Sequence, residues 1–407
     1  MQFSRRTDWN TDSTPLARAL AERRRRGLPV VDLTVSNPTR SGICYPDELL
    51  QPLLSPAVLD YDPDPRGQLR ARQAIAAYYA QRNVVLDPAR ILLTTGTSEA
   101  YSFLFRLLCN PGEEVLVPAP GYPLFDYLAD AESVRLLATP LIYDHGWQLD
   151  LTALEAVITP RTRAVILVHP NNPTGHFTSQ AESTALFEIC CRHRLALIVD
   201  EVFLDYPLVD VSAADAASFL ARPAPVPVFV VSGISKILGL PQMKLAWLAV
   251  AHPAADGLDS VVESIAQAAL ERLEVLADTF LSVGTPVQVA LPEWLAHAPA
   301  IQSQILTRIG SNLAALDAAL AAQPVALVSR LRAQAGWYAI LRIPALRPDE
   351  ETALLLLERG LWTHPGSFFS IPSSGWLVVS LLTPPTEFAI GICQLLSAIA
   401  EQALGQH

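Results

Sequence analysis

Hydrophobic residues in the first 250 positions form short, nearly continuous runs, separated by stretches in which apolar positions recur at helical spacing. Strands that are buried on both faces read as continuous apolar runs rather than as alternating ones. The intervening stretches, such as 98–109 and 180–193, have the spacing of helices. The pattern therefore predicts an α/β fold with a mostly parallel seven-stranded sheet and helices on both faces. The seven strand-like runs end at Thr95, Pro118, Ala138, Pro170, Asp200, Ser232 and Val250.

The pattern changes after about residue 252, where two long helices are predicted over 258–280 and 300–322. Strand-like runs at 336–344, 361–366 and 375–382 follow, and a helix over 387–404 closes the chain. This order indicates a second, smaller α+β domain. We expect residues 1–44 to form an N-terminal arm and part of the small domain, 45–280 a large cofactor-binding domain, and 281–407 the small C-terminal domain.

Composition narrows the classes of protein that fit this fold. The 407 residues carry a net charge of -11, which argues against a general nucleic-acid binder. A local basic run at 23–26 lies in a predicted helix that begins near Thr14 and Pro15 and ends at Gly27, and we interpret it as a solvated helix face. Although 51% of the residues are hydrophobic, no run reaches the roughly 18 to 20 apolar residues that cross a bilayer. We expect neither a nucleic-acid nor a membrane partner.

The N-terminus lacks the continuous apolar segment of a signal peptide. Five cysteines are odd in number and have no CxxC spacing, so neither a disulfide framework nor a metal site is predicted. A cytoplasmic location is the resulting expectation.

Polar and glycine-rich segments occur where the predicted strands end. Ligands of open α/β sheets bind beyond the carboxyl ends of the strands, so these segments indicate one composite site. Each segment taken alone could simply be a turn or loop between two elements. The segments are 95–100, 118–123, 169–175, 200–206 and 232–236.

Lys236 follows a buried strand and is flanked by Gly233, Ser235 and Gly239. A lysine amine becomes a nucleophile towards carbonyls when burial or a neighbouring cation lowers its pKa. A plain strand-end lysine fits the same pattern, so the sequence around Lys236 leaves both readings open.

Two further features point to an anionic, aromatic ligand. Asp200 ends a strand that is apolar on both faces, and a buried carboxylate needs a cationic or hydrogen-bonding partner. The protonated ring nitrogen of pyridoxal phosphate would be such a partner, whereas a turn or helix-cap aspartate is the alternative. Gly96 permits a tight turn after which the amides of Thr97 and Ser98 would open a helix towards an anion. The spacing of dinucleotide and nucleoside triphosphate loops is absent.

The order of these segments resembles the class I/II aminotransferases, which are fold-type I pyridoxal-phosphate enzymes. The resemblance covers essentially the whole chain. The segments that carry it are DLTVSNPT at 32–39, YDPDPRG at 61–67, LTTGTSEA at 93–100, PGYPLF at 120–125, HPNNPTG at 169–175, VDEVF at 199–203 and SGISKILGLPQMKLAW at 232–247.

This resemblance implies a role for each matching residue. Lys236 would form a Schiff base with pyridoxal 5′-phosphate and later act as the base, and Asp200 would pair with the ring nitrogen. Asn172 would hydrogen-bond the phenolic O3′, and Tyr122 would stack on the ring. The phosphate would bind at Gly96, Thr97 and Ser98, with Ser235 and Lys244 nearby, and Tyr61 would reach the cofactor of a neighbouring subunit. Those implied roles predict a homodimer with shared active sites.

Four positions depart from the family pattern. Phe203 replaces a tyrosine that bonds O3′, and Tyr206 is a candidate substitute for its hydroxyl. Gly233 replaces a serine, and Lys244 replaces an arginine of the phosphate site, which keeps the charge but loses the bidentate geometry. Val378 replaces the arginine that clamps the substrate carboxylate.

The missing clamp opens the question of which residues bind the substrate. Asn37 would lie near it by the resemblance, and Arg40, Arg66, Arg272 and His364 are candidates for a replacement cation. Helix-capping or surface roles are the alternative for the arginines.

The resemblance implies a pyridoxal-phosphate aminotransferase that transfers an amino group between an amino acid or related amine and a 2-oxo acid. Phe203 and Val378 encourage a second hypothesis, a decarboxylase or lyase of the same fold. A cofactor-binding regulatory protein without turnover is a third, but such proteins carry a DNA-binding domain for which we see no room before residue 32.

Overall fold

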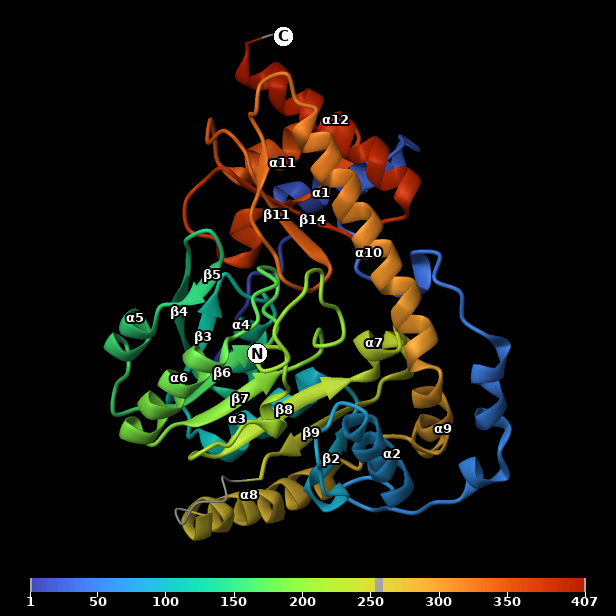
Figure 1. The fold of residues 1–407 in the computed structure, drawn as a ribbon, viewed down its shortest axis with the longest axis vertical. Coiled ribbons are helices and arrows are strands. Elements are labelled where there is room, and N and C mark those ends of the chain that lie inside the picture. Colours follow the sequence, from blue (N-terminus) through green and yellow to red (C-terminus); the bar gives the residue numbers. More distant parts are fainter. Residues whose placement is uncertain (1, 253–258, 406–407) are drawn as a thin grey trace.

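The computed structural model describes residues 2–252 and 259–405, and its centre is an eight-stranded sheet (Figure 1). The strands lie in the order β2-β9-β8-β7-β6-β3-β4-β5. The five strands β8, β7, β6, β3 and β4 are mutually parallel, whereas β9 runs antiparallel to both of its neighbours and β5 to β4. The bounds are β2 (Ile91–Thr94), β3 (Glu114–Ala119), β4 (Arg135–Tyr143), β5 (Trp147–Leu149), β6 (Thr162–Val168), β7 (Ala196–Asp200), β8 (Val228–Gly233) and β9 (Ala246–Val250).

The mostly parallel α/β sheet is confirmed, but the predicted number of seven strands was one too low. The additional strand is β5, which has only three residues and pairs with the end of β4 through a short turn. A run this short has no detectable period in the sequence, because a strand pattern needs at least about four alternating positions.

Both faces of the sheet are buried, as the continuous apolar runs predicted. In β6, Ala164 and Ile166 face a core that includes α3 and α8, while Val165 and Leu167 face a core that includes α2, α6 and α9. Alternation of side chains along the strand therefore supplies two separate cores. The helices around this sheet are α2 (Leu69–Ala80), α3 (Thr97–Leu108), α4 (Phe125–Glu132), α5 (Leu151–Ala156), α6 (Gln180–His193), α7 (Ile234–Ile237), α8 (Asp259–Phe280) and α9 (Thr285–Ala296).

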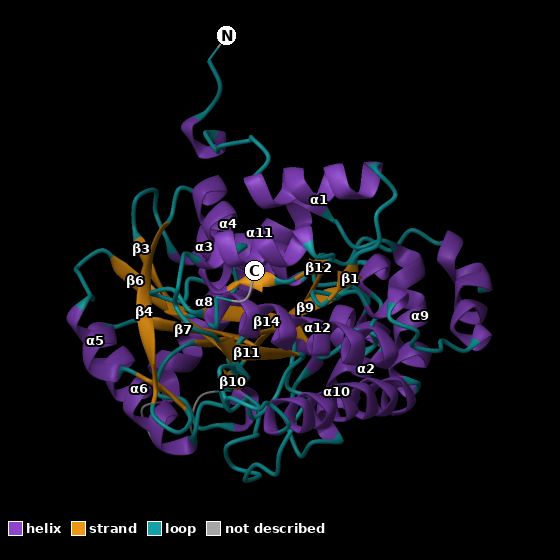
Figure 2. Cartoon of the chain, turned by 90° about the horizontal axis from the view of Figure 1, so that it is seen from above, coloured by secondary structure: helices purple, strands orange, loops and turns teal. Residues whose placement is uncertain are grey.

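A smaller antiparallel sheet, in the order β10-β11-β14-β13, lies at the other end of the molecule (Figure 1). The helices α11 and α12 lie beside it (Figures 1 and 2). The long helix α10 runs from beside α9 to this small sheet (Figure 1). The N-terminal strand β1 pairs in parallel with β12, so the start of the chain joins this region. The bounds are α1 (Pro15–Arg25), β1 (Val31–Asp32), α10 (Ala298–Ala321), β10 (Ser329–Arg330), β11 (Tyr338–Arg342), α11 (Asp349–Glu358), β12 (Leu361–Trp362), β13 (His364–Pro365), β14 (Trp376–Ser380) and α12 (Pro385–Ala403).

Local sequence signals explain where α1 starts and stops. The side chain of Thr14 accepts a hydrogen bond from an amide of the first turn of α1, and Gly27 follows the helix with a φ of 65°, as predicted. The predicted helix over 258–280 corresponds to α8, although Leu258 lies outside the described residues. The domain boundaries at residues 44 and 280 stay predictions.

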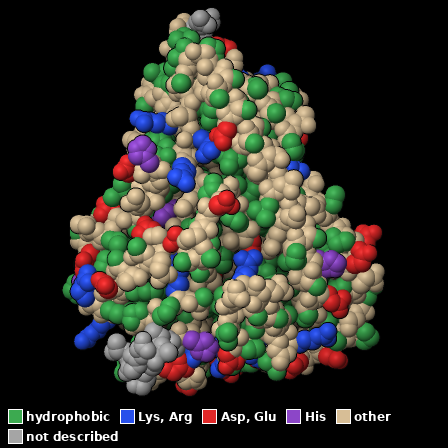
Figure 3. Space-filling view, in the orientation of Figure 1, with side chains coloured by type: hydrophobic (Ala, Val, Ile, Leu, Met, Phe, Trp, Pro, Cys, Tyr) green, Lys and Arg blue, Asp and Glu red, His purple; other side chains and the backbone are tan. Residues whose placement is uncertain are grey.

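Acidic and basic side chains lie interspersed over the face seen in Figure 3. None of the helices in the described parts of the chain combines the length and apolarity that a membrane-spanning helix needs.

Candidate active site

A cavity of about 160 Å³ lies at the carboxyl ends of the parallel strands, where the sequence placed its composite site. Val168, Asp200 and Gly233 end β6, β7 and β8 at its wall, and Thr97 begins α3 there. The structure thus brings six of the predicted residues to one cavity. These six are Thr97, Tyr122, Asn172, Asp200, Ser235 and Lys236.

Lys236 lies in α7, immediately after β8, and its amine faces two aromatic rings. The Nζ atom lies 4.8 Å from the ring centroid of Trp337 and 5.5 Å from that of Phe203. Burial lowers the pKa of Lys236 from 10.5 to about 8, while the nearby Asp200 carboxylate acts to raise it. A substantial neutral fraction therefore exists near pH 8, which is the form that attacks a carbonyl.

Asp200 is held by hydrogen bonds to both carboxylate oxygens. The Tyr101 hydroxyl donates to Oδ2 at 3.0 Å, and the backbone amide of Val202 donates to Oδ1 at 3.0 Å. Burial raises the pKa of Asp200 to about 6, although these hydrogen bonds and the Lys236 charge oppose the rise. The carboxylate is therefore ionised at pH 7 and available to a cation in the cavity.

The N-terminus of α3 supplies the anion-binding end of the site. As the first residues of a helix, Thr97 and Ser98 have backbone amides without intrahelical acceptors, and the helix dipole favours an anion there. A Cβ built at Gly96 would lie 3.4 Å from Nζ of Lys244, so this lysine approaches the same turn. Ser98 itself lies in the first turn of the helix but does not line the cavity.

Packing between β8 and β9 explains why this chain has a glycine at position 233. A Cβ at Gly233 would lie 2.7 Å from the Cβ of Ala246, because β8 and β9 approach closely where these two residues pair. The serine expected from the family pattern would collide with β9.

The residues present fit pyridoxal 5′-phosphate. Asn172 is buried at the cavity wall, and its side chain forms no hydrogen bond with the described residues, so its Nδ2 group can donate to a ligand. The cavity also combines an amine for the aldehyde, a carboxylate for the ring nitrogen and a helix N-terminus for the phosphate. Bound there, the cofactor would supply an electron sink for breaking a bond at the substrate α-carbon.

Tyr206 does not replace the hydroxyl that Phe203 lacks. Phe203 lines the cavity, but Tyr206 is completely buried and its hydroxyl donates to the backbone carbonyl of Lys236. The suggestion that Tyr206 bonds O3′ was therefore wrong, because its one donor is already used to fix the lysine backbone.

Sequence reasoning missed four residues of the site. Tyr101 could have been found, since it lies one helical turn after Thr97 and so shares its helix face. Tyr338 and Ser36 line the cavity from the small-sheet end of the molecule, and the ring of Trp337 faces the amine of Lys236. Only folding brings these three close; Ser36 lies in the segment 32–39 beside the predicted Asn37, whereas no local motif marks Trp337 and Tyr338.

Several predicted residues do not line the cavity of this chain. Asn37 uses its side chain to cap the short helical turn Pro38–Arg40, and Arg40 is exposed at the end of that turn. Tyr61 is 79% exposed. His364 stacks on Phe368 with ring centroids 4.9 Å apart, and burial lowers its pKa to about 4, so it is neutral at pH 7 and no carboxylate-binding cation.

The remaining candidates for a replacement clamp are also engaged elsewhere. Arg66 forms an ion pair with Glu274 at 2.6 Å, and Arg272 lies on α8 with a hydrogen bond to the Ala268 carbonyl. Val378 is fully buried in β14 between Ile340 and His364. Among the described residues that line the cavity, Lys236 is the one cationic side chain.

The sequence pattern of the aminotransferase class I and II family matches residues 8–388. The chain belongs to this family. It is an aminotransferase, and aminotransferases of this family are generally pyridoxal-phosphate-dependent.

The names of similar aminotransferases indicate several different substrates. Alanine aminotransferase of Mycobacterium bovis is 27% identical over 395 residues, which is 94% of this chain and 88% of that protein. Human tyrosine aminotransferase is 26% identical over 343 residues, or 83% and 72% of the two chains. Glutamate-pyruvate aminotransferase AlaA of Escherichia coli K12 is 30% identical over 270 residues, or 65% and 63%.

Solved structures support the same fold. An aminotransferase from Escherichia coli superposes with a TM-score of 0.83 at 24% identity, covering 98% of each chain. Alanine aminotransferase from Pyrococcus furiosus superposes with a TM-score of 0.84 at 21% identity, covering 98% of this chain and all of the other. The family match supports aminotransfer over the decarboxylase, lyase and regulatory hypotheses.

Proposed function

We propose that this aminotransferase binds pyridoxal 5′-phosphate in the Lys236 cavity and uses Lys236 as nucleophile and base. The observation that carries the proposal is the convergence in one cavity of a buried amine, a buried carboxylate and the N-terminus of α3. Each group matches one functional part of the cofactor.

The proposed roles follow from this chemistry. Lys236 binds the aldehyde covalently, and Asp200 keeps the ring nitrogen protonated with Tyr101 holding the carboxylate in place. The amide of Asn172 donates to O3′, and Tyr122 covers the ring. Gly96, Thr97 and Ser98, together with Ser235 and Lys244, bind the phosphate.

The substrates of the family are an amino donor and a 2-oxo acid acceptor. Because Val378 is buried and His364 is neutral at pH 7, we propose that the substrate carboxylate meets neutral donors of this chain, such as the hydroxyls of Tyr338 and Ser36. Asn37 and Arg40 follow Ser36 in the chain, and we propose that they lie near the substrate, although neither lines the cavity.

We also propose a homodimer in which Tyr61 reaches the phosphate of the neighbouring subunit. The exposure of Tyr61 and of the apolar side chains of Leu54 and Leu59 supports this proposal. A cytoplasmic location stays a prediction from the sequence.

The test uses the fact that the chain has only two lysines, Lys236 and Lys244. In cofactor-free protein, we expect acetylation of Lys236, followed by mass spectrometry, to accelerate as the pH rises through about 8. Loading with pyridoxal 5′-phosphate should protect Lys236 and produce a visible absorption band. Lys236→Ala should lose the covalent link, and an amino donor should convert the wild-type spectrum.

Two controls separate the parts of the proposal. Asp200→Asn removes the charge that raises the Lys236 pKa, so the labelling midpoint should fall below that of the wild type, whereas Glu188→Gln on the exposed face of α6 should not change it. A wild type that stays colourless after reconstitution, with Lys236 unprotected, would falsify the proposed cofactor. Release of CO₂ without spectral conversion by the donor would count against transamination.

A further inference from the structure

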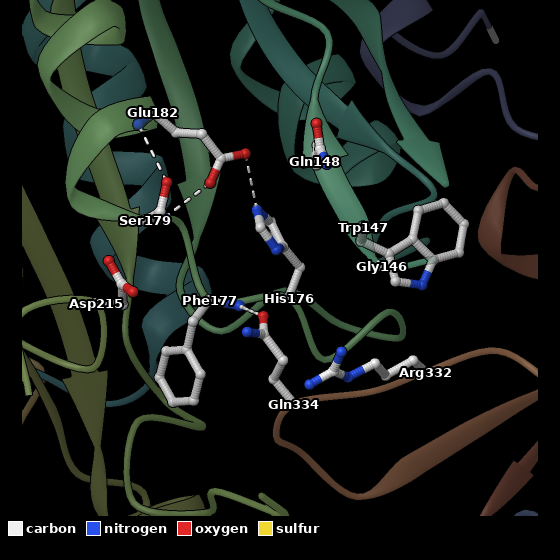
Figure 4. Close-up of a pocket in the computed structure, with 10 residues that line it drawn as sticks. All are labelled: Gly146, Trp147, Gln148, His176, Phe177, Ser179, Glu182, Asp215, Arg332 and Gln334. Carbon is white, nitrogen blue, oxygen red and sulfur yellow. Dashed lines mark hydrogen bonds and ion pairs between the residues drawn. The ribbon is translucent and has the colours of Figure 1, made fainter. Parts of the chain in front are cut away.

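A second pocket, of about 330 Å³, lies outside the Lys236 cavity, between the β4–β5 hairpin, the start of α6 and the segment 332–334 (Figure 4). Its volume falls at the lower end of the range of about 300 to 1,000 Å³ that small-molecule sites span. None of the proposed cofactor-binding residues lines it.

Opposite charges lie on opposite sides of this pocket. Figure 4 shows Ser179, Glu182 and Asp215 on one side and Trp147 and Arg332 on the other. Neither Arg332 nor Asp215 forms an ion pair with any of the described residues, although both line the same pocket. Two charges held apart in this way leave room for a ligand that carries both complements.

Hydrogen bonds hold the side chains of the acidic side, and Asp215 retains acceptor capacity. Glu182 already accepts hydrogen bonds from His176, Leu149 and Ser179. Burial acts to raise the pKa of Glu182, but these hydrogen bonds outweigh it and lower the pKa to about 2. Asp215 accepts one hydrogen bond at each oxygen, from the Gln180 amide and the Ser212 hydroxyl, so each oxygen has a lone pair left.

The side chain of Arg222 holds the loop that carries Asp215. The buried Arg222 guanidinium donates to the backbone carbonyls of Asp215 and Ala214. The carboxylate therefore does not need to be ordered when a ligand binds.

The opposite side offers donors without partners. The Arg332 side chain is exposed, and no described side chain or carbonyl accepts from its guanidinium, which lines the pocket. The backbone amide of Arg332 donates to the Tyr143 hydroxyl at 3.0 Å, and Tyr143 packs edge-to-face on Trp147 at 5.2 Å. Tyr143 thus joins Arg332 and Trp147 in one connected wall.

We propose that this pocket binds a free α-amino acid as a zwitterion, with its carboxylate on Arg332 and its ammonium group on Asp215. A simple carboxylate or a simple amine would satisfy only one side and leave the other charge unpaired. The pocket is a binding site separate from the Lys236 cavity, and the proposal does not depend on the cofactor.

The position of the pocket gives such a ligand a link to the active site. The segment 332–334 leads into Trp337 and Tyr338, and the amide of Gln334 donates to the carbonyl of Gly175, three residues after Asn172. A Cβ at Gly175 would lie 2.2 Å from the Ala335 carbonyl oxygen, so the two segments are in direct contact. A ligand that joins Asp215 to Arg332 therefore bridges this contact.

The test is equilibrium dialysis of the cofactor-loaded enzyme with radiolabelled α-aminoisobutyrate, which has no α-hydrogen and is not turned over. We expect a saturable class of binding that leaves the cofactor spectrum unchanged. Arg332→Gln and Asp215→Asn should each weaken it by about tenfold or more, because each removes one charge-assisted contact.

Arg347→Gln is the matched control, because Arg347 also forms no ion pair among the described residues and lies outside the pocket. Isobutyrate and isopropylamine, which carry one charge each, should compete at least about tenfold more weakly than the amino acid. Equal binding by Arg332→Gln, equal competition by isobutyrate, or binding that always changes the cofactor spectrum would each overturn the proposal. A colourless protein that still binds the probe would refute the cofactor and leave this site intact.

Discussion

At the scale of single residues, the proposed site depends on how burial changes the acid–base properties of two groups. Lys236 and Asp200 share one cavity, and burial moves the pKa of the amine down to about 8 and that of the carboxyl up to about 6. Both groups become less costly to neutralise, which suits a site that handles protons near neutral pH. Like the backbone amide of Val202, the Tyr101 hydroxyl limits the rise in the pKa of Asp200, since its hydrogen bond favours the charged form.

Tyr101→Phe tests this arrangement with a minimal change. Loss of the hydroxyl removes a donor from the Asp200 carboxylate, so the pKa of Asp200 should rise above about 6. A hydrogen bond to a charged group contributes about 1.5 to 3 kcal/mol, so the affinity for pyridoxal 5′-phosphate at pH 7 should fall about tenfold or more.

Fluorescence or absorbance titration with the cofactor measures this affinity. Tyr127→Phe, on the exposed surface of α4, is the matched control. If the affinity of Tyr101→Phe equals that of the wild type from pH 5 to 8, Asp200 does not rely on this hydroxyl.

At the scale of elements, close approach between β8 and β9 determines the turn that carries the reactive lysine. Gly233 ends β8, and the strand leads directly into α7 and Lys236. Its φ of 179° is ordinary extended backbone, so the glycine is required by the lack of space beside Ala246 and not by strain. The departure from the family serine is therefore a packing feature of this chain.

Gly233→Ala should overpack this contact. A methyl group forced against Ala246 should destabilise the fold by about 1 to 3 kcal/mol and displace Lys236. Urea unfolding gives the free energy of unfolding, and the labelling pH of Lys236 reports the displacement.

Gly310→Ala is the matched control, because nothing lies within 4 Å of a Cβ at this exposed position of α10. There the same change should stabilise the protein by about 0.5 to 1 kcal/mol, since alanine is the better helix former. Unchanged stability of Gly233→Ala would mean that β9 yields easily at Ala246.

At the scale of the whole molecule, the exposed apolar side chains are most prominent on the segment before α2 and on α8. Leu54, Leu59 and Tyr61 are 76%, 86% and 79% exposed, and Phe280 is 51% exposed. Apolar side chains clustered in this way mark an interaction surface more often than a free one. They are the surface on which the proposed homodimer depends.

Leu59→Asp should weaken that dimer. A charge in an apolar interface is left without a partner, so we expect a shift towards monomer and about tenfold weaker cofactor binding through loss of Tyr61 from the neighbouring site. Analytical ultracentrifugation measures the first effect and cofactor titration the second. Leu404→Asp, an exposed leucine just after α12, should change neither. A wild type that sediments as a monomer would contradict the proposed dimer.

The sequence by itself determined the α/β sheet, the positions of its main strands along the chain and the loops that meet at their carboxyl ends. Apolar runs and strand-end motifs are local, and parallel topology brings them to one edge without further information. This is why Lys236, Asp200, Asn172, Tyr122 and Thr97 could be predicted to share a site.

Only the tertiary structure decided which side chains remain free. Each of three reasonable candidates from the sequence is unavailable. The Tyr206 hydroxyl donates to the Lys236 carbonyl, Arg66 forms an ion pair with Glu274, and burial keeps His364 neutral at pH 7. Partner choice and burial depend on residues far apart in the chain, and no local pattern records them. The same holds for Arg332 and Asp215. Folding brings these two charges, which are distant in the sequence, to one pocket, but they do not form an ion pair with each other.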